Sequence, residues 1–543
     1  MEVHGDEASL VSELVDTMDV VVPDEDPERT EIELEPVVAP PDADDGDGWI
    51  DSVERRLVAV HPAAWCVLAG AIVFAIVFGR LGVQHHRNFG TWSFDMGIYD
   101  QGFWLISHGK SWNTVRGIDM WGHHVNLIAL AYAPFYWLGA GPSFLYVSQA
   151  IALGAGAIPV YLIATDRLKS PWYAMVFAFA YLMYAPIQWI SWANFHPEAL
   201  VITPMLFAWW FATRRNWGWC FGAVAVALST REDTALAIFM MGLVLLALMW
   251  RRSDATRHDR HMAMVVSAMG VIWYLICMRL VIPHFNRGQQ PFYIDYFYGN
   301  YGSSTTEIVG EMLKRPDRVV SDATQPDRLR FYRDLLLPWG GLPLGGPLQL
   351  TMALPQMLAS VIGLSPYARM IRYQYTSIMI APIVIAAIEG GALAMRYRIG
   401  RWIVLPWLAV CMYVSNVAWS PSPLGTNYDV AWAQPSARHD LIRQAMKLIP
   451  DDASVTATYG ILPHLSHREQ IYDWPNPWKM AYFGNDDGYR LPDPSEIEYI
   501  ILDRRNVGDA EQPLVDSLIA PGGQFEVLFD QDDLLVGHRV HNP

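Results

Sequence analysis

Cysteine is scarce in this sequence: there are four in 543 residues, and no two are spaced as C-x-x-C. All four lie inside or at the edge of apolar segments, at Cys66, Cys220, Cys277 and Cys411. This placement is typical of small buried hydrophobic residues. It argues against a disulfide framework, a zinc site built on Cys and His pairs, and a cysteine nucleophile.

Most of the chain also has little net charge, although the total is −17 at pH 7. Residues 1–50 contain 17 Asp and Glu against one Arg, so the rest of the chain is close to neutral. A neutral body argues against nucleic acid as a partner, because that binding depends on a surplus of Lys and Arg. We expect residues 1–56 to form a disordered acidic tail, since they combine charge of one sign with proline and few aromatics.

Long apolar runs are abundant, and 52% of the residues are hydrophobic. They predict a mainly α-helical, multi-pass membrane protein, a transmembrane bundle of about eleven spans within residues 57–419. The expected spans are 62–83, 144–164, 172–191, 198–213, 217–230, 234–250, 263–283, 333–345, 346–363, 374–395 and 402–419.

The positions of Arg and Lys predict the orientation of these spans. Arg55 and Arg56 precede the first span without a cleavable signal before it, so we expect an uncleaved anchor, a cytoplasmic N-terminus and a location in the cell membrane. The other positive loops then share the cytoplasmic side, and the long outer loops are 84–143 and 284–332. Leu127–Leu138 is apolar, but a crossing there would turn later positive loops outward. We expect it to lie in the outer interface or to re-enter.

After Trp419 the long apolar runs stop. Short helix and strand patterns alternate, which predicts a small extracytoplasmic α/β domain over residues 420–543. No glycine-rich loop follows a strand, so we do not expect a nucleotide site. The stretch 472–478, Tyr-Asp-Trp-Pro-Asn-Pro-Trp, is typical of a loop that could lie over a cavity of the membrane part.

Two carboxylates follow the first span within the aromatic run Phe94–Trp104. If this run is helical, Asp95 and Tyr99 share one face and Asp100 lies beside it, so both acids can point into the same space. The spacing fits an alternative equally well, in which Asp95 caps a helix and Asp100 lies on a solvated face.

Further polar clusters mark the expected outer ends of other spans. Each has a local explanation, such as a helix that begins at Pro197, a loop at 231–233 that neutralises its own charges, or an arginine at 372 that extends to the interface. Together they predict a polar cavity at the outer face, because unrelated surface residues would not choose one side so regularly. The clusters are His123-His124, His196 with Glu198, Arg231-Glu232-Asp233, and Arg372 with Tyr375.

Several of these motifs resemble those of one family. They are Phe94-Asp95-Met96-Gly97-Ile98-Tyr99-Asp100-Gln101, Phe195-His196-Pro197-Glu198-Ala199-Leu200, Arg231-Glu232-Asp233-Thr234-Ala235, Tyr373-Gln374-Tyr375 and Pro463-His464-Leu465-Ser466-His467-Arg468. With this combination the chain, from about residue 60 onward, resembles the prokaryotic membrane-protein family catalogued as domain of unknown function 2079. Arg231 stands where that family more often has lysine, which keeps the charge. The family in turn resembles the GT-C superfamily of membrane glycosyltransferases, which use lipid-phosphate-linked sugars and carry an essential acid in the first outer loop.

This resemblance implies transfer of a sugar from a polyprenyl-phosphate donor to an acceptor on the outer side of the membrane. Asp95, with Asp100 as the second choice, would be the base that deprotonates the acceptor hydroxyl. Arg231 and Arg372 would hold the lipid phosphate. The rest of the pocket would consist of His196, Glu198, Glu232, Asp233 and Tyr375.

The residues leave open whether a divalent metal joins the carboxylates. They also leave two other functions. The first is a transporter or lipid-handling protein, although charges at the ends of spans are unlike the mid-membrane charges of transporters. The second is a non-catalytic membrane scaffold.

Overall fold

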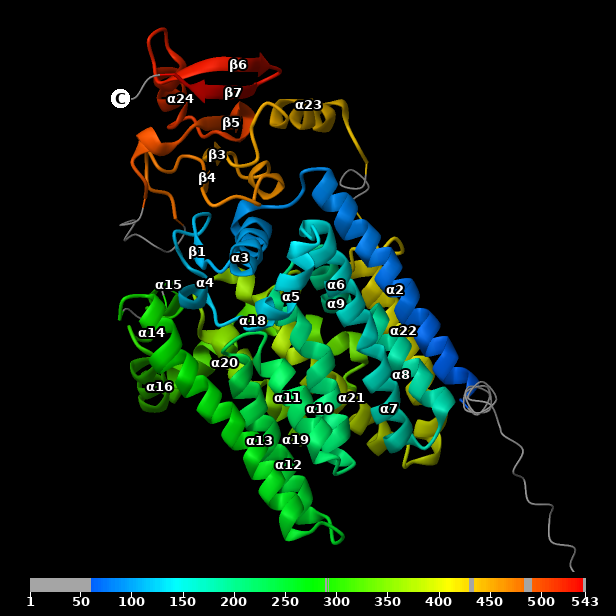
Figure 1. The fold of residues 1–543 in the computed structure, drawn as a ribbon. Helices are drawn as coiled ribbons and strands as arrows, with labels where there is room; N and C mark the ends of the chain where they lie inside the picture. The colour runs from blue at the N-terminus through cyan, green and yellow to red at the C-terminus, as the bar shows by residue number, and fades with distance from the viewer. Residues whose placement is uncertain (1–59, 289–290, 292, 429–433, 483–490, 541–543) are drawn as a thin grey trace, which may run out of the picture. The chain divides into compact units, whose positions relative to one another are not determined.

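The structure is a computed structural model that describes residues 60–288, 291, 293–428, 434–482 and 491–540. The predicted acidic tail, residues 1–56, lies outside the described residues. Val60–Pro543 form one compact unit, which contains both the long helices and the C-terminal sheet. The described part of this unit is mainly helical (Figure 1).

Among the described residues, six helical segments are long and apolar enough to cross a membrane, or seven if a bent pair is one span. With 26 residues, α2 is about 39 Å long and exceeds the hydrocarbon thickness of about 30 Å. The six are α2 (Pro62–Arg87), α6 with α7 (Pro142–Leu168), α12 (Thr234–Arg251), α13 with α14 (Arg257–Phe285), η8 with α21 (Gln374–Ala394) and α22 (Arg398–Trp419). The bent pair is α8 (Pro171–Met183) and α9 (Ala185–Trp192), which meet at 45°.

The other four expected spans are short helices or broken segments, so the described chain has fewer candidate spans than hydropathy predicts. Of these, α10 (Ile202–Thr213) and α11 (Trp217–Leu228) have 12 residues each, too few to cross a bilayer alone. The two spans expected over 333–363 are divided among α18 (Pro326–Leu336), η4 (Leu337–Trp339), η5 (Leu342–Gly345), α19 (Pro347–Leu350), η6 (Thr351–Ala353) and α20 (Leu354–Ile362).

Proline and glycine cause these breaks. Pro338 and Pro343 lack an amide hydrogen for a continuous helix, and Gly340 and Gly341 adopt left-handed φ angles of 62° and 77°. Much of this stretch lies against α21, although Leu337, Leu344 and Leu354 are exposed. Hydropathy counts it as two spans because mean hydropathy does not register where a helix is broken.

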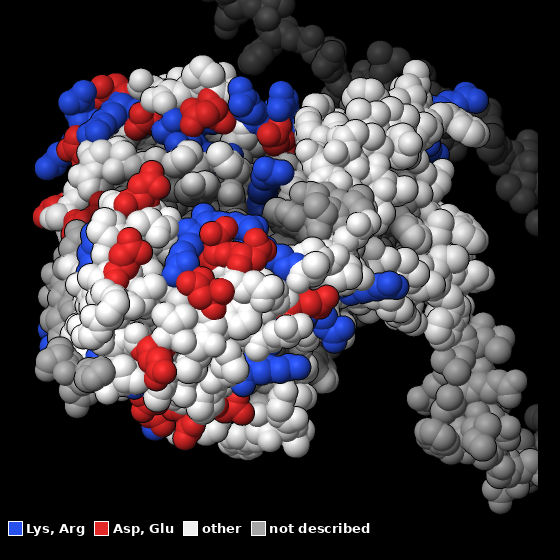
Figure 2. Space-filling view, turned by 90° about the horizontal axis from the view of Figure 1, so that it is seen from above, with Lys and Arg blue, Asp and Glu red and all other residues white. Residues whose placement is uncertain are grey.

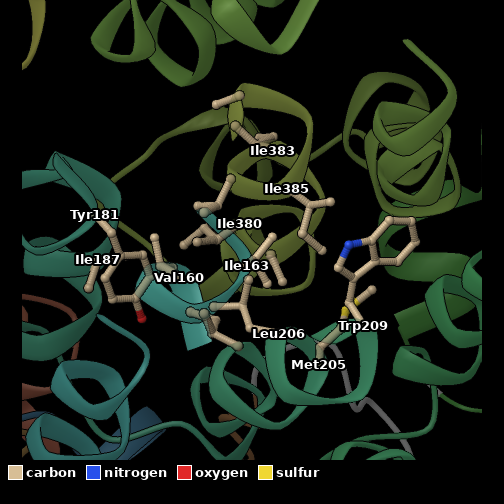
Figure 3. Packing of buried hydrophobic residues seen from close by; sticks show 14 of the residues in the cluster. Val160, Ile163, Tyr181, Ile187, Met205, Leu206, Trp209, Ile380, Ile383 and Ile385 are labelled. Carbon is tan, nitrogen blue, oxygen red and sulfur yellow. The ribbon is translucent and has the colours of Figure 1, made fainter. Parts of the chain in front are cut away.

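The central helix is α21 (Ser377–Ala394), of which 78% of the apolar window is buried, against 28% for α22. Figure 3 shows it packed against α7 (Ala157–Leu168) and α10, with Ile380, Ile383, Ile385, Val160, Ile163, Met205, Leu206 and Trp209 in contact. The outer helices α2, α13 (Arg257–Ile276) and α22 instead expose Ile76, Ile272 and Trp402. Such exposed apolar faces are expected of helices that contact lipid.

Shorter elements connect one end of these helices. They include η1 (Ser93–Gly97), α3 (Ile98–Ser107), the hairpin β1 (Trp112–Asn113) and β2 (Ile118–Asp119), α4 (Met120–His123), α5 (Ile128–Trp137), η2 (Pro197–Val201), η3 (Cys277–Val281), α15 (Tyr293–Tyr298), α16 (Thr305–Lys314), α17 (Pro316–Ala323) and η7 (Pro366–Arg369). The apolar segment 127–138 contains α5, which has ten residues and is too short to cross a bilayer. It packs against α3.

Beyond α22, five strands form one mixed sheet in the order β4-β3-β5-β7-β6. They are β3 (Val455–Ala457), β4 (Ile471–Asp473), β5 (Tyr499–Asp503), β6 (Phe525–Gln531) and β7 (Leu534–Arg539), accompanied by α23 (Ala437–Met446) and α24 (Gln512–Ile519). β3 pairs in parallel with β4 and β5, and β7 pairs antiparallel with β5 and β6. The stretch 472–478 is not entirely a loop, because its first two residues belong to β4.

The sheet lies at the same end of the helices as α3 and β1 (Figure 1). Seen from above, charged side chains gather over the sheet, while the part formed by α2 and neighbouring helices shows almost none (Figure 2). This distribution agrees with a helical part in lipid and a sheet in water.

Candidate functional site

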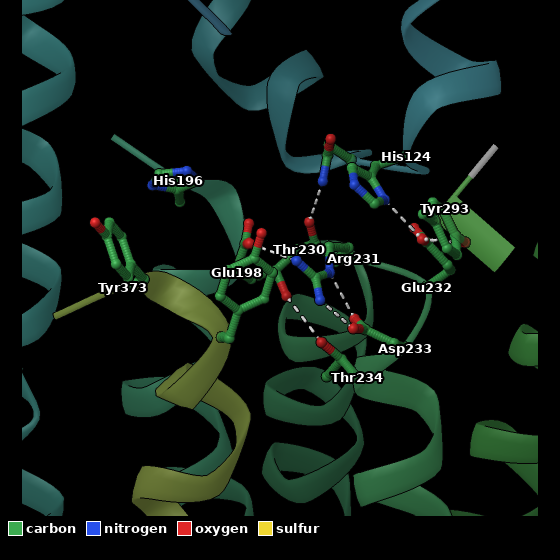
Figure 4. A network of polar contacts seen from close by, with 12 residues as sticks. His124, His196, Glu198, Thr230, Arg231, Glu232, Asp233, Thr234, Tyr293 and Tyr373 are labelled. Atoms are coloured by element: carbon green, nitrogen blue, oxygen red, sulfur yellow. Dashed lines mark hydrogen bonds and ion pairs between the residues drawn. The ribbon is translucent and has the colours of Figure 1, made fainter. Parts of the chain in front are cut away.

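A cavity of about 590 Å³ lies where several of these helices end. Its polar side chains come mainly from η1, the start of η2, the loop before α12 and the residues around α4 and α15. Hydrogen bonds join many of them into groups centred on Asp95, Arg231 and Glu232, the last two of which Figure 4 shows. Its aliphatic lining comes from α12, η3, α16 and α20 and includes Leu236, Met240, Met278, Val309, Met312 and Leu358. The cavity therefore combines a charged network with a long apolar wall.

Asp95 reaches this cavity from the π-helical turn η1. The Gly97 N–H donates to the Trp92 carbonyl at 3.1 Å and closes the wide turn. Such turns are uncommon and occur frequently at functional sites. The Asp95 carboxylate accepts a hydrogen bond from Asn194 Nδ2 at 3.2 Å and lies 3.3 Å from His196 Nε2. Asp95 therefore does not cap α3, whose N-cap residue is Gly97.

His196 is held in place by two contacts with its neighbours. Its N–H donates to Gln149 Oε1 at 2.9 Å, and its Nδ1 lies 3.0 Å from the Asn194 carbonyl oxygen. Since Nδ1 faces an acceptor, it carries a hydrogen, and Nε2 faces Asp95. Burial opposes protonation of the ring, but Asp95 and Glu198 outweigh it and raise the pKa of His196 above its usual value.

Arg231 binds two carboxylates. Its Nε donates to Asp233 Oδ1 at 2.8 Å, its Nη2 donates to the other oxygen of Asp233, and its Nη1 donates to Glu198. A loop that neutralises its own charges therefore explains the pairing of Arg231 with Asp233. It does not explain the pairing with Glu198, which lies in the first turn of η2. The Glu198 side chain is 2% exposed and that of Asp233 is 27% exposed, so Asp233 is the partner that a ligand can replace.

Glu232 accepts three hydrogen bonds, from His124 Nδ1 at 2.7 Å, the Val125 N–H at 3.0 Å and the Tyr293 hydroxyl at 2.9 Å. Burial opposes its ionisation, but His124 and Arg231 lower the pKa of Glu232 to about 2. These bonds join the segment between α4 and α5, the loop before α12, and α15. Tyr293 carries no sequence signal that distinguishes it from the other tyrosines of the chain.

Negative charge exceeds fixed positive charge in this network. Four carboxylates line the cavity with one arginine and three histidines, namely Asp95, Glu198, Glu232, Asp233, Arg231, His123, His124 and His196. Within the described ranges, no three His, Cys, Asp or Glu side chains are arranged to hold a metal ion. Protonation of His196, whose pKa is raised, reduces the excess of negative charge.

A second cavity, of about 680 Å³, shares Asp95 with the first. It lies among η1, the hairpin turn, the segment 365–375 and the residues after β3 and at the end of β4. The Ser93 N–H donates to the Tyr459 carbonyl at 3.0 Å, so the sheet rests directly on η1. Asp95 can thus be reached from two cavities.

Asp100 lines neither cavity and is fully buried. Its carboxylate accepts hydrogen bonds from the Tyr136 hydroxyl at 2.7 Å and from Ser466 Oγ, and it lies 3.0 Å from His467 Nε2. The neighbouring Gln101 donates to the Arg468 carbonyl at 3.1 Å. The structure places Asp100 neither beside Asp95 nor on a solvated face. Through Asp100 and Gln101, the sequence motif 94–101 contacts the motif 463–468.

Seven of the nine predicted site residues line the first cavity, and the exceptions are Asp100 and Arg372. Tyr375 lines both cavities. Arg372 is exposed, and its guanidinium lies 4.3 Å from the centre of the Trp189 ring. In the second cavity, the sequence singled out Tyr373 and Tyr375 as part of a motif, and Asp473 only as part of the stretch 472–478. It did not single out Arg116, Tyr296, Tyr367, Tyr459 or Tyr482, because they belong to no common motif.

Two crystal structures of ArnT from Cupriavidus metallidurans are similar in fold. The apo structure has a TM-score of 0.50 and 15% sequence identity, and the alignment covers 88% of this chain and 98% of that chain. The structure bound to undecaprenyl phosphate has a TM-score of 0.49 and 14% identity over the same shares. At this identity, the likeness of the apo structure indicates a similar fold and nothing about substrate.

No curated protein matches the sequence. The family described as a predicted membrane protein, DUF2079, matches residues 85–536. That match covers most of the chain and includes every motif on which the resemblance was based. The chain therefore belongs to the DUF2079 family of predicted membrane proteins.

Proposed function

We propose that this protein is a GT-C-type glycosyltransferase that moves a sugar from a polyprenyl-phosphate donor to an acceptor hydroxyl at the outer face of the membrane. The first cavity is the main support, because a charged network and a long aliphatic wall occur in the same space. A lipid-linked donor has the same two parts, a phosphate head and an apolar chain. Burial of that chain contributes about 0.8 kcal/mol per CH₂ group.

In the proposed reaction, Asp95 acts as the general base. It takes the proton of the acceptor hydroxyl while the hydroxyl oxygen forms a bond to the anomeric carbon of the sugar. The bond between that carbon and the phosphate oxygen breaks, and polyprenyl phosphate leaves with the electron pair. Asn194 and His196 orient the carboxylate from 3.2 Å and 3.3 Å.

The leaving phosphate is proposed to bind at Arg231. Its guanidinium is a planar fork that suits two phosphate oxygens, and the partly exposed Asp233 is the partner that phosphate would displace. The buried Glu198 would stay in place and hold the arginine. Protonated His196, whose pKa is raised, would reduce the repulsion between phosphate and the nearby carboxylates.

The remaining predicted roles follow from this arrangement. We assign Asp100 a positioning role, because it holds the C-terminal motif on α3. Tyr375 is suited to contact substrate from either cavity, whereas Arg372 lies outside both. We propose that the charged network faces outward, with residues 57–419 in the membrane, the acidic tail in the cytoplasm and residues 420–543 outside.

The test is a transfer assay in membrane vesicles that contain the full chain, with a panel of polyprenyl-phosphate sugars as donors and endogenous acceptors. Asp95→Asn keeps the size of the side chain but removes the base. We expect it to insert normally and to lose about 10²-fold or more in transfer rate.

Asp317→Asn is the matched control, because Asp317 is exposed on α17 and pairs only with a neighbouring arginine. It should transfer at the wild-type rate. Full activity of Asp95→Asn would refute the catalytic assignment. If wild-type protein moves a labelled lipid across the membrane but transfers no sugar, a transport function is the better explanation.

A further inference from the structure

The second cavity differs from the first in the side chains that line it. Its aliphatic residues are few, Val115, Met480 and Ala481, whereas half of its lining residues are aromatic. Six of these aromatic residues are tyrosines, at positions 296, 367, 373, 375, 459 and 482. A lipid chain finds its aliphatic wall in the first cavity, so the second suits a ligand of different chemistry.

The aromatic rings form pairs that present flat faces and edges. Trp92 and Tyr459 are stacked with ring centres 6.3 Å apart, and Tyr367 and Tyr373 meet edge to face at 5.3 Å. A sugar ring has apolar C–H faces and a rim of hydroxyls. Aromatic faces can pack on the former, and tyrosine hydroxyls can exchange hydrogen bonds with the latter.

Asp473 is the acid that the sheet contributes to this cavity. It is the last residue of β4, and Tyr459 follows the neighbouring parallel strand β3, so both come from the carboxyl ends of parallel strands. Ligands of α/β sheets commonly bind at such ends. Oδ1 of Asp473 is buried and has no hydrogen bond of good geometry within the part of the chain that the structure describes, although the nearby Ser93 hydroxyl interacts with the carboxyl and lowers its pKa. A ligand hydroxyl would satisfy that oxygen.

The protonation of Asp473 also suits a ligand with hydroxyl groups. Burial raises the pKa of this carboxyl to about 7, so near neutral pH it can act as donor or as acceptor. The guanidinium of Arg116, which lies 5.5 Å from the centre of the Phe94 ring, adds a positive charge to the lining. The cavity thus offers both kinds of hydrogen-bonding group together with aromatic surfaces.

We propose that the second cavity binds the acceptor and that the acceptor is a carbohydrate, with its rings on Tyr367 and Tyr459 and its hydroxyls on Asp473. This inference rests on the proposed glycosyl transfer and names the class of acceptor for the same site. One sugar hydroxyl reaches Asp95 from the second cavity, while the donor approaches from the first. That hydroxyl gives its proton to Asp95 and forms the glycosidic bond as the bond to the lipid phosphate breaks.

Binding can be measured without turnover, by saturation-transfer NMR on the full chain in detergent micelles. The probes for the second cavity are neutral trisaccharides of glucose, mannose, galactose or N-acetylglucosamine. Dodecyl phosphate is the probe for the first cavity. We expect wild-type protein and Asp95→Asn to bind dodecyl phosphate and at least one trisaccharide.

Two variants remove different parts of the proposed sugar contact. Tyr367 is half-exposed, so Tyr367→Ala should fold normally and weaken trisaccharide binding about two- to tenfold. Asp473→Ala removes the buried carboxyl and should weaken it about tenfold. Dodecyl phosphate should bind both variants as it binds the wild type. Tyr397→Ala, an exposed tyrosine outside both cavities, is the control and should change neither.

The results separate this proposal from the proposed function. If no trisaccharide binds the wild type, or if binding is unchanged in Tyr367→Ala and Asp473→Ala, the carbohydrate site is refuted even where dodecyl phosphate binds. If both variants lose dodecyl phosphate instead, the second cavity belongs to the lipid and the acceptor assignment is wrong. If sugar binding follows the variants but the wild type transfers nothing, the catalytic proposal fails and the carbohydrate site remains.

Discussion

Asp95 and Asp100 stand five residues apart in one motif, but their surroundings give them different tasks. Asp95 lies in the wall of two cavities, whereas Asp100 is fully buried among Tyr136, Ser466 and His467. Spacing on a regular helix suggested one shared space. The π-helical turn η1 holds Asp95 outside the register of α3. Residue propensities do not predict such a turn.

At the same scale, substitutions of Arg231 test whether the charged network needs the forked guanidinium group or only a positive charge. Arg231→Met leaves Glu198 buried without its cation, and loss of one partner of such a pair costs about 3–5 kcal/mol. Arg231→Lys keeps the charge but cannot bind both oxygens of Asp233 together with Glu198. Thermal unfolding in detergent micelles should show a large loss for Met and a smaller loss for Lys.

Arg315→Met is the matched control for this comparison, because its pair with Asp317 is exposed and is worth less than about 1 kcal/mol. The Tm of this variant should stay close to that of the wild type. Equal Tm values for Arg231→Met and Arg315→Met would show that the buried network does not hold the fold together.

Among the elements, hydropathy correctly predicts the long apolar helices that continue without a break, such as α2, α12 and α22. It fails over 333–363, where prolines and glycines break an apolar stretch that is only partly buried. The prolines and glycines in the sequence indicate where the helix breaks. They do not indicate whether the apolar side chains around the breaks contact lipid or protein.

The C-terminal strands show a similar division. β3, β5, β6 and β7 lie within a few residues of the strand patterns near 454–458, 498–502, 526–529 and 534–539, from which the sequence predicts strands. β4 has three residues, at the edge of the sheet, between a charged segment and a proline-rich one, so its pattern is too short to detect. Without β4, the sequence predicts residues 472–478 only as a loop over a cavity and does not show that Asp473 ends a strand beside β3.

His467 and Asp100 hold the segment after η10 (Leu462–His464) on α3, and this contact should depend on pH. Burial opposes protonation of His467, but Asp100 outweighs it and raises the pKa of His467 above 6.5. A group with a raised folded pKa stabilises the fold fully below its unfolded pKa, and this contribution is lost as pH rises through the folded pKa. We expect the Tm of the wild type to fall from about pH 6 to about pH 8 by more than that of His467→Gln.

The difference between the two Tm curves is the quantity to measure, because all other titrating groups are common to both proteins. Parallel curves over this range would show that the His467–Asp100 pair is not an ion pair in the folded state. A residual slope in both curves would come from other groups, such as His196, and would leave the difference interpretable.

For the whole molecule, the candidate site lies at the junction of two kinds of structure. The helical part supplies the aliphatic wall and the charged network, and the sheet supplies Tyr459 and Asp473. The motif 94–101 takes part in both, since Asp95 faces the cavities while Asp100 and Gln101 bind the C-terminal motif. The fold therefore brings together motifs that are distant in sequence. Their occurrence in one chain predicted a site but not how its residues are arranged.

This arrangement makes the orientation of the chain in the membrane a decisive property, because donor and acceptor must meet on the side where the sheet lies. Ser517 on α24 and Ser253 between α12 and α13 are both exposed, and the distribution of Arg and Lys predicts that they lie on opposite sides. In a Cys66→Ala background, Ser517→Cys should react with a membrane-impermeant maleimide in intact spheroplasts. Ser253→Cys should react only after the membrane is permeabilised. The reverse pattern would place the sheet in the cytoplasm, where the outer-face reaction proposed for Asp95 could not occur.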